Sequence, residues 1–245
     1  AHTRYNEHNL TEIETMGLIS SREKTDLLKA LNFIWNIRNR IHAITGRKYD
    51  RLLFEHQLQI AVDLGIEAQG DQRPVEAFLG YLHAAMECVK QQYLIFLYEQ
   101  GLEKKRQRRR VALKSTKISG LQVDNGRIIN FTADDPDAVI EHNPELLMHI
   151  FAEASNLQLP LGSDARRLVA KWGAKFGEVA NAPLAVKSFE HVLTAPNGVY
   201  NVLNAMLNTG LLEKFVKEYG GITNLIKYDE YNVYAVARHS LRTVK

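Results

Sequence analysis

The chain has 245 residues, of which 45% are hydrophobic and 24% charged, and its formal net charge is +3. These values are ordinary for a globular protein with one large or two small domains, and so small a charge does not predict a nucleic-acid partner. The single cysteine, Cys88, excludes an intrachain disulfide, and no apolar run is long enough to span a membrane. We therefore expect a cytoplasmic protein that binds neither membranes nor nucleic acid.

A long amphipathic helix is predicted after Ser20. Ser20 and Glu23 have the spacing of a capping box, in which each side chain hydrogen-bonds to the backbone of the other residue. One stripe of this helix recurs at steps of three and four residues and is predicted to face the core: Leu28, Leu31, Trp35, Arg38 and His42. Two polar residues, Arg38 and His42, thus lie on an otherwise apolar face.

Two more helices are predicted before residue 110. The stretch "DRLLFEHQLQIAVDLG" is a helix that Gly65 ends, and Pro74 suits the first turn of a long helix. The stripe of this long helix that is predicted to face the core contains Val75, Phe78, Leu82, Met86, Val89, Tyr93 and Phe96. The basic run Lys104–Arg110 follows. A solvated helix end explains this run better than an RNA or an acidic partner, because no aromatic residues interleave with it.

The second half begins with a predicted β-hairpin, in which two short β-type runs flank the turn Asp124-Asn125-Gly126. Several helices follow, and Gly210 is expected to break one of them into two. The predicted fold class is therefore all-α, with one small β-hairpin in the middle. We divide the chain into a helical part at 1–110, a hairpin connector at 111–133 and a second helical part at 134–245.

Four arginines lie between residues 38 and 51, together with one histidine and one aspartate. One interpretation is a set of salt bridges that lock two helices through Asp50 and Glu55. The other is an anion site for nucleotide phosphates, because arginine makes planar two-point contacts to phosphate oxygens. Salt bridges are the commoner use of such a cluster. The candidates for a phosphate contact are Arg38, His42, Arg47 and Arg51.

His239 lies in a predicted helix near the end of the chain. A metal-dependent phosphohydrolase of the HD type needs a first histidine, a His-Asp pair on a later helix and a distant aspartate, which together hold a divalent metal. No His-Asp dipeptide occurs in the 245 residues. His239 is therefore a candidate ligand of an incomplete site, or an ordinary helical residue, and we predict no catalytic residue in this chain.

The stretch "LNFIWNIRNRIHAITGRKYDRLLFEHQLQIAVDLG" resembles the helical segment that follows the nucleotidyltransferase domain in bacterial protein-PII uridylyltransferase/uridylyl-removing enzymes. "IETMGLISSREK", the hairpin around Gly126 and "ADDPDAVIEHNPELLMHIF" are also similar to that family. The segment from Thr194 to Arg242 resembles the entrance to its HD domain, where a tyrosine-aspartate pair, here Tyr228 and Asp229, precedes the first metal-binding histidine, here His239.

The resemblance implies a central helical fragment of such a protein in nitrogen signalling, located between an upstream nucleotidyltransferase domain and a downstream HD domain. The longer protein would use Mg²⁺ and UTP to modify a PII-type signalling protein, whereas this chain alone would bind no cofactor and have neither activity. The chain departs from the family at Asn232, where a histidine is usual, and at Ala237 or Arg238, where an acidic residue is usual. An alternative is therefore a non-catalytic signalling or scaffold module related to that family.

Overall fold

A computed structural model describes residues 10–68, 70, 72–100, 120–124, 128–131, 133–226, 228 and 235–244. Within these residues the regular structure consists of helices and a single two-stranded antiparallel hairpin, so the predicted all-α class is confirmed. Packing divides the chain into two units. Unit 1 contains Ala1–Phe96 and Asn224–Val236, and unit 2 contains Leu97–Thr223 and Ala237–Lys245. The predicted domains 1–110, 111–133 and 134–245 stay a prediction.

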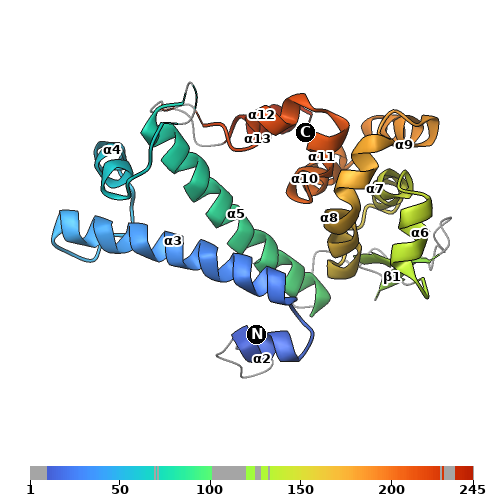
Figure 1. Cartoon of the computed structure of the whole chain (residues 1–245), viewed down its shortest axis with the longest axis horizontal. Helices are drawn as coiled ribbons and strands as arrows, with labels where there is room; N and C mark the ends of the chain where they lie inside the picture. Colours follow the sequence, from blue (N-terminus) through green and yellow to red (C-terminus); the bar gives the residue numbers. More distant parts are fainter. Residues whose placement is uncertain are drawn as a thin grey trace. The chain divides into compact units, whose positions relative to one another are not determined.

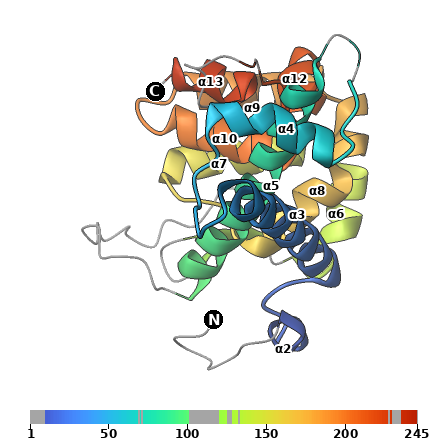
Figure 2. The same cartoon turned by 90° about the vertical axis from the view of Figure 1, so that its left-hand side faces the viewer.

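The described part of unit 1 contains four helices: α2 (Leu10–Thr15), α3 (Ser21–Thr45), α4 (Phe54–Asp63) and most of α5 (Pro74–Glu99). The capping box at the start of α3 is confirmed, because the Ser20 N–H donates to Glu23 over 2.7 Å and the Glu23 N–H donates to Ser20 Oγ over 3.2 Å. Gly46 ends α3 at φ 65°, a left-handed conformation that glycine adopts without strain. In unit 1, α4 lies between the C-terminal half of α3 and the start of α5 (Figures 1 and 2).

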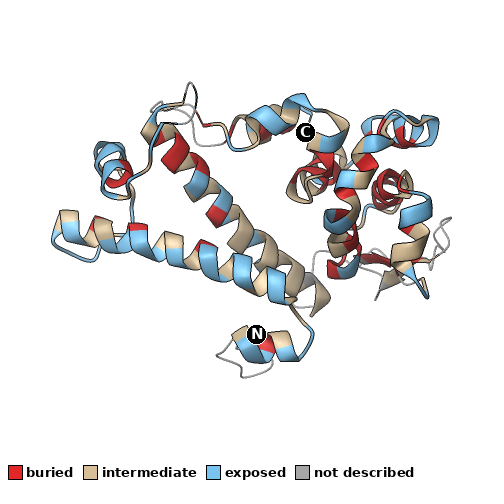
Figure 3. Ribbon diagram, viewed as in Figure 1, coloured by how far each residue is buried: buried red, intermediate tan, exposed pale blue. Residues whose placement is uncertain are grey.

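The core of unit 1 is small and involves another face of α3 than the predicted one. Its buried residues are Ile37, Ile41, Ile60, Ala61, Val75 and Phe78. The predicted core stripe of α3 was wrong, because Leu28 is 40% and Trp35 58% exposed. Exposed and half-buried residues make up most of α3 (Figure 3). The two apolar faces have the same helical spacing, and α4 packs against the one that carries Ile37 and Ile41.

The predicted core stripe of α5 holds only near the start of that helix. Val75 and Phe78 are 2% and 0% exposed, whereas Met86 and Tyr93 farther along are 52% and 61% exposed. Helical periodicity identified the face correctly, but α4 covers only its first turns. The basic run Lys104–Arg110, predicted after this helix, lies outside the described residues.

Unit 2 contains the hairpin and most of the remaining helices. The strands are β1 (Leu121–Asp124) and β2 (Ile128–Phe131), paired from Leu121↔Phe131 to Asp124↔Ile128. Their connecting residues Asn125 and Gly126, predicted as a turn, are outside the described residues. The helices are α6 (Pro136–His142), α7 (Leu146–Leu157), α8 (Ser163–Glu178), α9 (Pro183–Leu193), α10 (Val199–Asn208), α11 (Leu211–Phe215), α12 (Glu218–Ile222) and α13 (Val236–Arg242), whose first residue belongs to unit 1.

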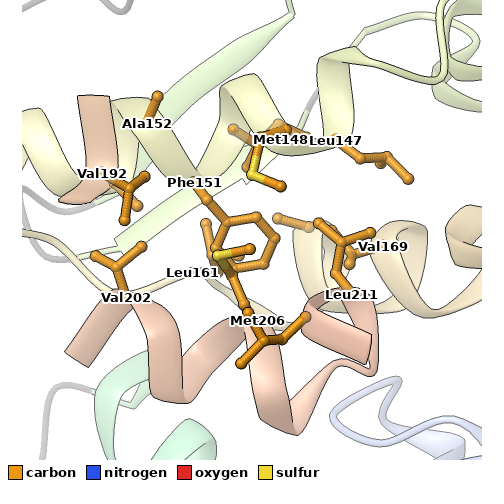
Figure 4. Packing of buried hydrophobic residues seen from close by; sticks show 14 of the residues in the cluster. Leu147, Met148, Phe151, Ala152, Leu161, Val169, Val192, Val202, Met206 and Leu211 are labelled. Carbon is orange, nitrogen blue, oxygen red and sulfur yellow. The ribbon is translucent and has the colours of Figure 1, made fainter. Parts of the chain in front are cut away.

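The central element of unit 2 is α7. Eight of its twelve residues are buried, which is typical of a helix that is surrounded by its neighbours rather than lying on a surface. Phe151 is fully buried at the middle of the cluster, between residues of α8, α10 and α11 (Figure 4). Gly210, at φ 75°, separates α10 from α11 as predicted.

The described helices do not have the properties of a membrane span. None of them combines the length and the hydropathy that crossing a bilayer requires.

Candidate functional site

Three of the predicted residues meet where the end of α3 faces the loop that leads to α4. Arg38 and His42 are one helical turn apart, so both side chains reach the same carboxylate. Arg38 binds Asp50 in a two-point manner, with Nε 2.6 Å from Oδ1 and Nη2 3.1 Å from Oδ2. The Nε2 atom of His42 is 3.0 Å from the same Oδ1. The salt-bridge interpretation is therefore correct for Arg38 and His42.

The charge of Asp50 is stabilised by both partners. The hydrogen bond from Arg38, followed by that from His42, lowers the pKa of Asp50 from 3.8 to about 2. The Asp50 side chain is 63% exposed, so this is a surface cluster and its net contribution to stability is small. Because the carboxylate already neutralises Arg38, an incoming anion would have to displace it.

Arg47 and Arg51 do not join that cluster. The Arg47 guanidinium lies 5.4 Å from the centre of the Tyr49 ring, a weak cation–π contact at an exposed site. Arg51 is exposed, and within the described residues neither arginine forms an ion pair. Glu55, the other predicted partner, is 3.6 Å from His56 instead. These two guanidinium groups are therefore the ones available to an anion in this loop.

His239 lies on the exposed side of α13. Ala237, two residues earlier, is fully buried in the core of unit 2. Arg238 is turned toward α10, where Nη1 donates to Asn204 over 2.7 Å and Nη2 donates to Asn208 over 2.6 Å. In the described part of the chain no three metal-binding side chains come together, so His239 has no assembled metal site there. Asp229 and Asn232, which were also singled out in the sequence, lie outside the described residues.

Sequence reasoning missed Arg73 and Glu76, which hold Tyr228 at the start of α5. Glu76 accepts the N–H of Arg73 over 2.9 Å and the N–H of Tyr228 over 3.1 Å. These contacts, with the Arg73 side chain foremost, lower the pKa of Glu76 from 4.5 to about 2. The signal was present as Arg73-Pro74 followed by Glu76, which is the spacing of half a capping box. The contact with Tyr228, 152 residues later, has no local signal.

The depressed pKa of Asp50 gives a pH prediction. The ionised carboxylate contributes its stabilisation above the unfolded pKa of 3.8, and this contribution is lost as pH falls toward about 2. We expect Asp50 to remain ionised at about pH 3 in a carboxyl NMR titration. Arg38→Ala should raise its midpoint, whereas Arg51→Ala should not. A midpoint near the ordinary value in the wild-type chain would contradict the cluster.

The chain was compared with known proteins. Residues 1–97 match the family model described as GlnD PII-uridylyltransferase. The match ends beside Phe96, the last residue of the first segment of unit 1. A protein from Novosphingobium aromaticivorans, called a bifunctional uridylyltransferase/uridylyl-removing enzyme, is 27% identical over 96% of this chain and 26% of its own length. The chain is related to the protein-PII uridylyltransferases.

Other proteins of that description align over nearly the whole chain. The relative from Rhodopseudomonas palustris is 28% identical over 98% of this chain and 27% of its own length. The one from Zymomonas mobilis is 27% identical over 93% of this chain and 24% of its own length. The chain thus spans about a quarter of the uridylyltransferase relatives that it matches. No solved structure matches it.

Proposed function

We propose that this chain is the central helical part of a longer uridylyltransferase/uridylyl-removing protein in bacterial nitrogen signalling, acting in the cytoplasm. In that protein, a nucleotidyltransferase domain upstream would transfer UMP from UTP to a PII-type signalling protein, and an HD-type domain downstream would remove it. The relatives support this proposal, since their names contain both activities and they match this chain nearly end to end. The chain alone would have neither activity.

Within this proposal, unit 1 supports the nucleotide site of the longer protein. One observation carries the assignment: of the four candidate phosphate contacts, Arg38 and His42 are already bound to Asp50, whereas Arg47 and Arg51 are exposed without an ion pair among the described residues. Arg47 and Arg51 would contact the UTP phosphates, since guanidinium groups bind phosphate oxygens through paired hydrogen bonds. The Mg²⁺ that accompanies UTP would be held by carboxylates of the upstream domain.

Arg51→Ala in the longer protein tests this assignment. The loss of one charged contact to phosphate should weaken UTP binding roughly tenfold, measured by calorimetry. The melting temperature should stay unchanged because the side chain is exposed. Arg22→Ala is the matched control, since this arginine of α3 is 82% exposed and pairs loosely with Asp26 at 3.9 Å. A lower melting temperature with unchanged UTP binding would show that Arg51 only supports the helices.

A non-catalytic signalling or scaffold module is the second candidate. It is favoured by α13, in which Ala237 or Arg238 is expected to stand where the family usually has an acidic residue. Ala237 is used for packing and Arg238 for binding two asparagines of α10. An assay of the longer protein with labelled UTP and a PII-type acceptor separates the two. Transfer of label supports the enzyme, and its absence supports the scaffold.

A further inference from the structure

Among the described residues of the second segment of unit 1, Tyr228 contacts both α4 and the start of α5. Its ring stacks on Phe54, the first residue of α4, with centroids 4.4 Å apart and planes 10° from parallel. The Arg73 guanidinium lies 5.0 Å from the centre of the Tyr228 ring. The ring thus lies against an aromatic residue of α4 and a cation next to α5.

The backbone of Tyr228 is also bound, through hydrogen bonds to Arg73 and Glu76. Its N–H donates to Glu76 Oε1 over 3.1 Å, and its carbonyl accepts from Arg73 Nη2 over the same distance. The Tyr228 hydroxyl donates to the carbonyl of Phe54 over 3.3 Å. Glu76 also binds the Arg73 side chain over 3.0 Å. The Arg73–Glu76 ion pair therefore binds both the N–H and the carbonyl of Tyr228.

The residues just before Tyr228 fit the same surface. The carbonyl oxygen of Asn224 lies so close to Gly80 that an added Cβ would be 2.6 Å from it, which is less than any normal contact. Ile226 is only 2% exposed. The described residues Asn224, Leu225, Ile226 and Tyr228 are here called the strap, and Asn224 and Tyr228 place it against the start of α5.

The strap also binds the first residue of α13. The N–H of Val236 donates to the carbonyl of Leu225 over 2.9 Å. The first N–H groups of a helix have no partner inside the helix, so this contact satisfies one that would otherwise need a cap. The start of α13, three residues before His239, is thus bonded to the same strap that Tyr228 anchors on α4 and α5.

From these contacts we propose that Tyr228 is a positioning residue. Within unit 1 it ties the N-terminal ends of α4 and α5 to the strap and, through Leu225, to Val236, so that a change at Tyr228 affects both Phe54 and Val236. The start of α4 follows the loop that carries Asp50 and Arg51. These contacts are ring stacking, one ion pair and hydrogen bonds, and they hold whether or not the longer protein transfers UMP.

Hydrogen–deuterium exchange of the 245-residue chain tests this proposal at α4 and at Val236 in one experiment. Tyr228→Ala should speed exchange at least tenfold both within α4 and at the Val236 N–H, while α7 stays protected. Tyr228→Phe keeps the stacking and the backbone contacts and should exchange like the wild type. Tyr93→Ala is the matched control, because that tyrosine of α5 is 61% exposed.

A second variant changes the contact between α5 and Asn224 of the strap and leaves the Tyr228 ring intact. Gly80→Ala adds a methyl group against the Asn224 carbonyl while favouring the helical conformation of α5 itself, so it should loosen the strap without unravelling α5. It should reproduce the faster exchange in α4 and at Val236. The proposal is overturned if either variant loosens α4 and leaves Val236 as in the wild type, or if Tyr93→Ala has the same effect as Tyr228→Ala.

Discussion

Phe151→Ala is expected to lower the free energy of unfolding of unit 2 by ~3–5 kcal/mol. The Phe151 side chain is fully buried on α7 and lies at the centre of the cluster, so its removal leaves a cavity lined by several elements (Figure 4). The neighbours cannot all move inward, because each is also packed on its other side. The cost therefore includes the lost burial and the cavity.

The two tryptophans allow this loss to be measured for one unit. Trp35 belongs to α3 of unit 1 and Trp172 to α8 of unit 2. In a Trp35→Phe background, urea unfolding followed by fluorescence reports unit 2 alone. Leu193→Ala, at a residue of α9 that is 46% exposed, is the control and should cost less than ~1 kcal/mol. Equal losses for the two variants would mean that α7 is not the centre of the core.

The helices and their ends could be predicted from the sequence because their signals are local. The capping box at Ser20, the glycines at 46 and 210 and the proline at 74 each act on the backbone within a few residues. The hairpin was predictable for the same reason. Which apolar face of α3 is buried was not predictable, since that depends on where α4 packs and both faces have helical spacing.

The sequence brought the residues of the charged cluster together, but it did not show which of them form ion pairs. Clustering along the chain identified Arg38, His42, Asp50 and the two later arginines, yet it could not say which cation Asp50 would bind. That choice follows from helix geometry, because Arg38 and His42 are one turn apart and face the same loop. The position of Tyr228 on Phe54 joins residues 174 apart in the sequence, which no local pattern encodes.

Arg238→Ala should lower the free energy of unfolding of unit 2 by ~2–3 kcal/mol, because two partly buried charge-assisted hydrogen bonds disappear together. Arg238→Lys should recover only part of this loss, since one ammonium cannot replace a planar fork that reaches Asn204 and Asn208 simultaneously. Lys187→Ala, which removes an exposed cation of α9, is the matched control and should stay within ~0.5 kcal/mol. Urea unfolding in the Trp35→Phe background measures all three.

The result also decides what holds α13 in unit 2. If Arg238→Ala is as stable as the control, the buried residues Ala237 and Leu241 suffice to hold the helix, and water replaces the guanidinium at both asparagines. If the loss is as large as expected, the Arg238 side chain is required to hold α13 on α10. An acid at this position would then cost stability, because a carboxylate accepts hydrogen bonds and cannot donate to the two asparagine oxygens.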